Sequence, residues 1–197
     1  MKTRYDYDVL VLGSGAAGMS IALHLPSNLK IAIVSKSDLS EGATYWAQGG
    51  MAAALHADDS IDSHIADTIT VGGELCDPTV VKHVVKNASE VVNWLLNLGV
   101  PFDRRSSTTI NELHLTMEGG HSHRRIVHAT DQTGRAISNV LGDKLRDSSN
   151  VDIFTNRVAV DILIEEGISS GAYILNKDNG LVEVFQARCT VLATGGA

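Results

Sequence analysis

Cysteine and proline are scarce in this chain, and its apolar stretches are short. The two cysteines, Cys76 and Cys189, lie far apart and in no spacing typical of metal ligands. This argues against a disulfide framework or a zinc site and favours a reducing compartment. The uncharged run from Val9 to Leu23 is shorter than the about 20 residues that a membrane-spanning helix needs. Because Asp6 and Asp8 precede that run, we also expect no targeting peptide and a cytoplasmic protein.

Basic charge is also in deficit. The chain of 197 residues has 16 Lys and Arg against 23 Asp and Glu, a formal net charge of -7. This balance excludes a general affinity for nucleic acid or for anionic lipid. The one dense basic cluster, His123 to Arg125, is more typical of a solvated or ion-paired patch. With 44% hydrophobic residues the chain can bury a core, and its length indicates one or two domains.

The first 35 residues have the pattern of a βαβ unit. Asp8 to Leu12 is a short apolar run that predicts a strand buried on both faces of a parallel sheet. Ala16 to Leu25 has helical spacing and stops at Pro26, where a helix cannot easily continue. Lys30 to Val34 predicts a second buried strand.

Further along, the sequence predicts three helices and then a β-rich end. The helices are expected at Asp62 to Gly72, at Thr79 to Leu98 with Asp77 as N-cap, and at Asp131 to Leu145. Ser37 to Ala54 is interpreted as a loop that runs into a helix near Gly50, and Pro101 to Ile126 as a long polar loop. Strands are expected at Val151 to Thr155, Val158 to Ile164, Gly171 to Leu175, Val182 to Phe185 and Cys189 to Ala193, the third and fourth as a hairpin and the last as a buried strand.

A dinucleotide fingerprint joins the first strand to the first helix. Gly13-Ser14-Gly15-Ala16-Ala17-Gly18 is a weak motif alone, but here it lies after a strand and opens a helix. The first glycine permits the tight turn, the second lets a pyrophosphate approach the backbone, and the third allows close helix packing. The helix N-terminus adds unpaired N–H donors. The motif therefore predicts nucleotide binding.

The identity of the dinucleotide stays open at this point. NAD sites usually have an acidic residue about 20 positions after the fingerprint to bind a ribose. This chain has Ser35 and Lys36 there. Lys36 can meet the 2′-phosphate of NADPH, or it can lie along the phosphates and ribose of FAD.

The segment from Ala43 to Gly50 favours a flavin. Its glycines stand beside hydroxyl and amide side chains, a backbone that can lie against a flat heterocycle such as isoalloxazine and donate hydrogen bonds to it. An ordinary glycine-rich loop is the alternative interpretation of this segment.

Several motifs together resemble one family over the whole chain. They are Gly13 to Gly18, Ser35-Lys36, Tyr45 to Gly50, the run from His114 to Arg125, Thr133-Gly134-Arg135, and Leu192 to Gly196. This combination is similar to the L-aspartate oxidase family, which belongs with the flavoproteins of succinate dehydrogenase and fumarate reductase. The resemblance implies an α/β, Rossmann-like FAD-binding domain with a parallel sheet and an inserted β-meander, incomplete at the C-terminus.

The resemblance also implies a cofactor site. Relatives that bind FAD covalently have a histidine at the position of Ala43, so the FAD is expected to be non-covalent. Ser14 to Ala17 would hold the pyrophosphate and Lys36 would meet the adenosine side. The cofactor-binding residues implied in full are Gly13, Ser14, Gly15, Ala16, Ala17, Gly18, Lys36, Ala43, Thr44, Tyr45, Trp46, Ala47, Gln48, Gly49, Gly50, and, near the adenine, Val158 and Ala159.

One acidic residue corresponds to a substrate-orienting position of that family. Glu118 would attract the ammonium of L-aspartate, which fumarate lacks; a solvated loop glutamate is the alternative. His114, His121 and His123 lie close to it in sequence and could suggest a metal site. Their glycine and arginine neighbours favour hydrogen-bonding or flavin-loop roles instead, so no metal is expected.

By this resemblance the whole protein would oxidise L-aspartate to iminoaspartate in NAD biosynthesis, with oxygen or fumarate as electron acceptor. The next enzyme of quinolinate synthesis is a further expected partner. The family's catalytic residues, its capping domain and its C-terminal helical domain correspond to positions after Ala197, so none of those catalytic residues is expected in this chain. We expect residues 1–197 to be the N-terminal part of a single FAD-binding domain. The alternatives are an inactive or standalone nucleotide-binding module, an NADPH-dependent reductase, and a fumarate reductase or succinate dehydrogenase-like subunit.

Overall fold

The computed structural model describes residues 3–105, 113–130 and 132–196. The chain divides into two compact units. The sheet unit comprises residues 1–46 and 137–197, and the helical unit comprises residues 47–136. Each unit is described by itself.

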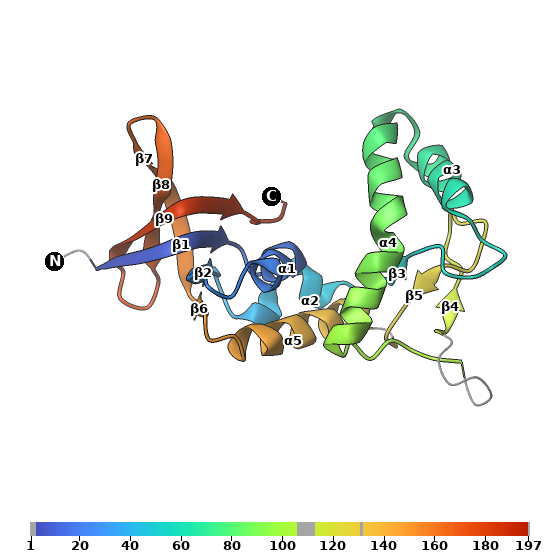
Figure 1. The fold of residues 1–197 in the computed structure, drawn as a ribbon, viewed down its shortest axis with the longest axis horizontal. Helices are drawn as coiled ribbons and strands as arrows, with labels where there is room; N and C mark the ends of the chain where they lie inside the picture. Colours follow the sequence, from blue (N-terminus) through green and yellow to red (C-terminus); the bar gives the residue numbers. More distant parts are fainter. Residues whose placement is uncertain (1–2, 106–112, 131, 197) are drawn as a thin grey trace. The chain divides into compact units, whose positions relative to one another are not determined.

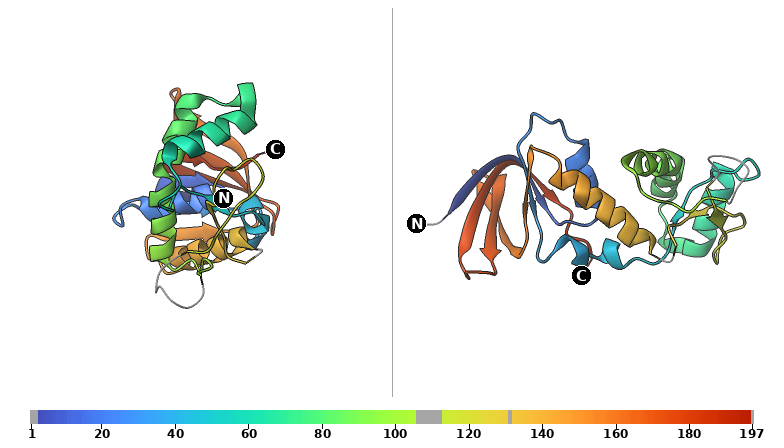
Figure 2. Two further views of the ribbon diagram at one scale, coloured as in Figure 1. Left: turned by 90° about the vertical axis from the view of Figure 1, so that its right-hand side faces the viewer. Right: turned by 90° about the horizontal axis from the view of Figure 1, so that it is seen from below.

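A mixed six-stranded sheet forms the centre of the sheet unit (Figure 1). Its strands are β1 (Arg4–Leu12), β2 (Ile31–Val34), β6 (Val151–Phe154), β7 (Arg157–Glu165), β8 (Ile168–Asn176) and β9 (Val182–Leu192), in the order β6-β2-β1-β9-β8-β7. The first four of this order are parallel neighbours, and β9, β8 and β7 form an antiparallel meander. Figure 2 shows the meander as a twisted ribbon that continues the sheet. The predicted α/β class, parallel sheet and β-meander are confirmed.

The βαβ opening is also confirmed. Helix α1 (Ala16–His24) connects β1 to β2, and all four residues of β2 are buried, as expected for a strand covered on both faces. Tyr5, Tyr7, Phe154 and Phe185 form an aromatic cluster in the core, with Tyr5 and Phe185 stacked at 4.5 Å between ring centroids. Two short helical turns, η1 (Leu39–Glu41) and α2 (Ala43–Trp46), follow β2.

The helix predicted at Asp131 to Leu145 exists as α5 (Thr133–Arg146). Asp131 lies outside the described residues. The part of α5 that belongs to the sheet unit buries Ile137, Leu141 and Leu145 on one face, at helical spacing.

The helical unit contains two longer helices and a small sheet. Helices α3 (Ile61–Gly72) and α4 (Pro78–Leu98) are joined through η2 (Gly73–Leu75) and pack on each other. The Asp77 carboxylate accepts hydrogen bonds from the backbone N–H groups of Thr79 and Val80, so the predicted N-cap is confirmed. Strands β3 (Met51–Ala52), β4 (Leu115–Thr116) and β5 (Ile126–Val127) form an antiparallel sheet in the order β3-β5-β4.

Two local predictions are wrong. The helix expected near Gly50 is absent from that position, because Met51 and Ala52 pair with Val127 and Ile126 as a strand. The final strand, Cys189 to Ala193, is not separate and not buried. It continues β9, which pairs with β8 as far as Gln186. Beyond Gln186, β9 pairs with β1 alone among the described strands, and Leu192 is 67% exposed.

Candidate functional site

Two glycines of the fingerprint are required by the folded chain itself. Gly13 has a φ of +118°, and a Cβ placed on it would lie 2.1 Å from the carbonyl oxygen of Ala193. A Cβ on Gly18 would lie 2.1 Å from the carbonyl oxygen of Gly13. These positions let β1, the turn and α1 pack closely, in agreement with the roles that the motif assigns to its first and third glycines.

Gly15 is different, because the described fold gives no reason for a glycine there. Its φ of -73° and ψ of -180° suit any residue, and the only atom near an added Cβ is the hydroxyl oxygen of Thr44 at 3.4 Å. Gly15 is the N-cap of α1 and offers no side chain to cap the helix. A bare backbone beside a helix N-terminus is what the close approach of a diphosphate requires, so this turn fits the dinucleotide.

Ser14 and Thr44 fix the turn from two sides. The hydroxyls of Ser14 and Ser35 are hydrogen-bonded at 2.7 Å in the buried interior, which ties the turn to the end of β2. The backbone N–H of Ala16 donates to the Thr44 hydroxyl at 3.0 Å, so one N-terminal donor of α1 is already satisfied by the protein. Both contacts were missed from the sequence, because their partners are 21 and 28 positions apart and give no local pattern.

The proposed adenosine side lies next to this turn. Lys36 follows Ser35 at the end of β2 and is exposed. The N–H of Arg157 donates to the carbonyl oxygen of Ser35, which brings the start of β7, with exposed Val158 and Ala159, alongside the end of β2. The structure therefore brings Lys36, Val158 and Ala159 into one region, and their roles stay predictions.

The strand order places the turn where open α/β sheets bind ligands. From β1 the chain proceeds to β2 and β6 on one side, whereas β9 lies on the other side of β1. The carboxyl ends of β1 and β9 therefore flank a topological switch point, and ligands of such sheets bind outside the strand ends there. Gly13 to Gly18 follows β1 at this point, and Thr194 to Gly196 follows β9.

The predicted flavin-lining segment spans the boundary between the two units. Ala43 to Trp46 belong to the sheet unit and Ala47 to Gly50 to the helical unit. Residues 46–49 are exposed, and the Trp46 ring, in edge contact with Tyr45, is 70% exposed. Gly50 packs so closely that a Cβ would lie 2.3 Å from the carbonyl oxygen of Val127.

A comparison with known families identifies the nucleotide. Residues 8–197 match the family model described as FAD binding domain. The chain belongs to the FAD-binding domain family. This membership identifies FAD, rather than NADPH, as the nucleotide of the chain.

Curated and solved relatives of this FAD-binding chain agree with that assignment. It is 49% identical to the L-aspartate oxidase of Pseudomonas aeruginosa over 100% of the chain and 38% of that protein. It is 44% identical to the L-aspartate oxidase of Vibrio cholerae over 98% of the chain and 38% of that protein. A structure of E. coli quinol fumarate reductase has a TM-score of 0.92 and 29% identity, over 99% of the chain and 33% of that structure. The chain thus spans about two fifths of the length of the curated relatives it matches.

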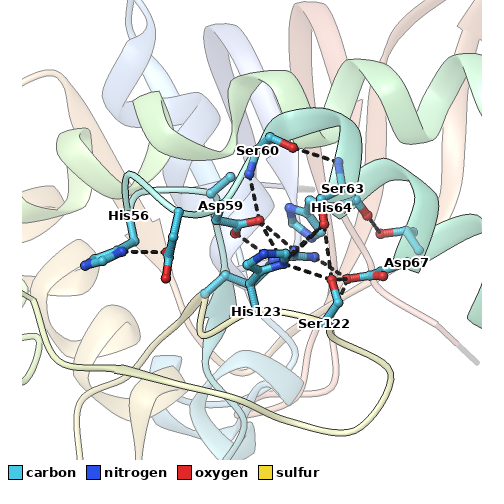
Figure 3. Close-up of polar contacts among 12 residues, drawn as sticks. His56, Asp59, Ser60, Ser63, His64, Asp67, Ser122 and His123 are labelled. Carbon is cyan, nitrogen blue, oxygen red and sulfur yellow. Dashed lines mark hydrogen bonds and ion pairs between the residues drawn. The ribbon is translucent and has the colours of Figure 1, made fainter.

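The helical unit holds a buried ion network that the sequence did not predict (Figure 3). Arg125 is completely buried and donates a bidentate pair of hydrogen bonds to the carboxylate of Asp59, from Nε at 2.8 Å and from Nη2 at 2.7 Å. Its third nitrogen donates to Asp67 at 2.8 Å. The network thus ties the loop before α3, α3 itself and β5 together. The basic cluster from His123 to Arg125 was expected to be a solvated or ion-paired patch, and the ion-paired alternative holds for Arg125.

Ser122, Ser63 and His123 extend the network. The backbone N–H and the hydroxyl of Ser122 both donate to Asp67, at 2.8 and 2.7 Å. These bonds, with the Arg125 charge, lower the pKa of Asp67 to about 2. The Nδ1 atom of His123 lies 2.9 Å from the Ser122 hydroxyl and 3.2 Å from that of Ser63.

The remaining predicted residues of this unit are spread along the β4–β5 hairpin. Glu118 is exposed in the turn after β4. At the other end of the hairpin, His114 Nδ1 lies 2.9 Å from His128 Nε2, and His128 Nδ1 lies 3.0 Å from an Asp103 oxygen. His114 and His123 thus have hydrogen-bonding roles. The rings of His121 and His64 lie 5.7 Å apart between centroids. The role of Glu118 stays a prediction.

His64 should make the chain sensitive to mild acid. It is 5% exposed, and burial lowers its pKa, with the Arg125 charge as a further cause. Below about pH 6.5 the unfolded chain therefore binds a proton that folded His64 resists, and stability falls as the pH drops. We expect Tm to decrease as the pH is lowered from about 7.5 to about 5.5, and His64→Leu to reduce that decrease.

His83→Gln, at an exposed position on α4, is the control and should leave the pH dependence of Tm unchanged. An unaltered decrease in His64→Leu would contradict this role.

None of the helices in the described ranges combines the length and apolar character that a membrane span needs.

Proposed function

We propose that the chain is the FAD-binding N-terminal portion of an L-aspartate oxidase, which oxidises L-aspartate to iminoaspartate in NAD biosynthesis. The observation that carries the proposal is the 49% identity to an L-aspartate oxidase over the entire chain. Oxygen or fumarate would be the electron acceptor, and the next enzyme of quinolinate synthesis a partner. The expected cytoplasmic location belongs to the same proposal.

The residues of this chain would bind and position the two reactants. The bare backbone at Gly15 and the N-terminus of α1 would hold the diphosphate of FAD, and Ala43 to Gly50 would line its ring. The flavin would supply the acceptor for the hydride that leaves the α-carbon of L-aspartate. Glu118 would orient the substrate by attracting its ammonium, while the catalytic residues would come from outside residues 1–197. Ala43 supports non-covalent binding, because a methyl group cannot form a bond to the flavin.

A fumarate reductase or succinate dehydrogenase-like subunit is the second candidate. The TM-score of 0.92 to quinol fumarate reductase favours it on fold, but the identity is 29%, well below that to the L-aspartate oxidases. The two candidates differ chemically at one point. An amino-acid substrate carries a cation that a carboxylate such as Glu118 attracts, whereas succinate and fumarate carry only negative charge and would be repelled by it.

Anaerobic mixing of the purified, FAD-loaded full-length protein, of which residues 1–197 would be the N-terminal part, with L-aspartate or succinate tests the proposal. We expect L-aspartate to bleach the visible flavin absorbance and succinate to leave it unchanged. Bleaching by succinate alone would support the second candidate. Bound flavin that neither substrate bleaches would indicate a nucleotide-binding module. Acid precipitation of the same protein should leave all flavin in the supernatant, because no covalent bond is expected.

Glu118→Gln should raise the KM for L-aspartate by about tenfold, the effect of losing one exposed charge attraction of about 1.4 kcal/mol. Retention of FAD and Tm should not change, because Glu118 is exposed and lies outside the fingerprint. Steady-state kinetics of the full-length protein with L-aspartate measures the change. The matched control is Glu90→Gln, at an exposed position on α4. Glu112 is nearer in sequence, but it lies outside the described residues. An equal KM in Glu118→Gln and Glu90→Gln would contradict the proposed role.

A further inference from the structure

The connection between β4 and β5 is long for a hairpin. It comprises residues 117–125, and Glu118 is exposed near its start. The backbone N–H of His121 donates to the carbonyl oxygen of Glu118 at 3.2 Å. The N–H of Arg125 donates to the carbonyl oxygen of Thr116 at 3.1 Å, where the connection closes. Because fixing each residue of such a segment costs conformational entropy, these two bonds alone would leave Glu118 many positions.

Helix α3 lies against this connection along one face. The residues of that face recur at the three- and four-residue spacing that places helix positions side by side, and they are Ser63, His64, Asp67 and Val71. The ring of the buried His64 lies 5.7 Å from the ring of His121, between centroids. A Cβ placed on Gly120 would lie 2.7 Å from a methyl carbon of Val71, so the backbone of the connection packs on the end of α3.

Asp67 joins this face to the connection by hydrogen bonds (Figure 3). Its Oδ2 atom accepts from the backbone N–H of Ser122 at 2.8 Å and from the Ser122 hydroxyl at 2.7 Å. The same oxygen accepts from Nη1 of Arg125 at 2.8 Å. Hydrogen bonds to a charged acceptor are about twice as strong as neutral ones. One carboxylate oxygen of α3 therefore anchors the connection shortly after Glu118.

We propose that α3 positions Glu118 for the ammonium of the substrate, and that Asp67 is the positioning residue through which it does so. The inference rests on the proposed role of Glu118, the group that would touch L-aspartate. The attraction between a carboxylate and a cation depends on their distance, so a carboxylate on a fixed backbone orients the substrate better than one on a mobile backbone. Asp67 is already bonded to Ser122 and Arg125, which assigns it to the support of the connection and not to the substrate itself.

Steady-state kinetics of the full-length, FAD-loaded protein tests the inference with Asp67→Ala. We expect the KM for L-aspartate to rise roughly three- to tenfold, up to the effect of losing Glu118 itself, while kcat changes by less than about twofold. The inhibition constant of succinate should stay the same, because succinate has both carboxylates of L-aspartate but no ammonium. A general loss of packing would weaken the binding of both. Equal weakening of succinate and L-aspartate, or an unchanged KM, would overturn the inference.

Two further variants guard against a folding defect in Asp67→Ala. Ser122→Ala removes one hydrogen bond to Asp67 and leaves the ion pair of Asp67 with Arg125 in place, so it should give a smaller rise in KM with little change in Tm. An unchanged KM in Ser122→Ala overturns the inference if Asp67→Ala does not fold. Asp62→Ala, at an exposed position in the first turn of the same helix, is the matched control and should change neither KM nor kcat.

Hydrogen exchange gives a readout that does not depend on turnover. In the same protein, the backbone amides of residues 117–122 should exchange faster in Asp67→Ala than in the control Asp62→Ala, because the Ser122 N–H has lost its acceptor. Equal exchange in the two variants would show that Asp67 does not hold the connection, and the inference would fall.

A double variant with Glu118→Gln separates this inference from the proposed function. Once Glu118 has lost its charge, Asp67→Ala should raise the KM for L-aspartate no further, because the effects of residues that act through one another do not add. If Glu118→Gln leaves KM unchanged, the proposed role of Glu118 is wrong and the inference is wrong with it. If Glu118→Gln raises KM and Asp67→Ala does not, the inference alone is wrong.

Discussion

Replacing Arg125 by methionine should lower the free energy of unfolding by about 3–5 kcal/mol, the usual cost of removing one partner of a buried ion pair. Arg125 is fully buried, and its removal leaves the buried Asp59 carboxylate without its two-pronged partner. Asp67 loses a third donor at 2.8 Å. Urea unfolding followed by circular dichroism measures the change.

The neighbouring arginine is a close control for this prediction. Arg124→Met removes the same charge from an exposed position, so it should change the free energy of unfolding by less than about 0.5 kcal/mol. The double variant Arg125→Met with Asp59→Leu should lose less than the sum of the two single variants, because no buried charge is then left unpaired. Equal losses in Arg124→Met and Arg125→Met would show that the network is not a stabilising element.

Gly15→Val should weaken FAD binding at least about 100-fold, or about 2.7 kcal/mol, with little change in Tm. The backbone at Gly15 accepts any residue, and only the Thr44 hydroxyl at 3.4 Å lies near the new Cβ. The valine side chain would instead occupy the space that the diphosphate needs. Quenching of FAD fluorescence measures the affinity, and thermal unfolding without FAD measures the fold.

Gly18→Ala is the contrasting variant. Its Cβ would lie 2.1 Å from the carbonyl oxygen of Gly13, so both stability and FAD binding should be lost. Gly15→Ala should give a smaller loss of affinity than Gly15→Val, again without loss of stability. If Gly15→Val binds FAD as well as the unchanged chain, the diphosphate does not lie on this turn.

Features that depend on neighbouring residues could be predicted from the sequence. The βαβ unit follows from short apolar runs on either side of a glycine turn, and the start of α4 follows from Asp77 before Pro78. The face of α5 follows from its helical period. The fold class was predictable because the fingerprint lies between a strand and a helix, and the FAD cofactor because the combined motifs resemble a flavoprotein family.

Features that depend on distant residues were missed. The contacts of Arg125 with Asp59 and Asp67 join positions 66 and 58 residues apart, and no local pattern indicates them. The strand at Met51 and Ala52 is two residues long and is defined by its pairing with β5, so no local pattern indicated it. The exposure of Leu192 likewise depends on which strands lie beside β9.

Gel filtration of the chain after incubation with FAD, and separately with NADPH, tests the assignment of the nucleotide most directly. Retention of one FAD per chain, released in full by acid and not displaced by NADPH, is the expected result. Retention of NADPH in place of FAD would contradict the assignment, as would the elution of the folded chain without any nucleotide.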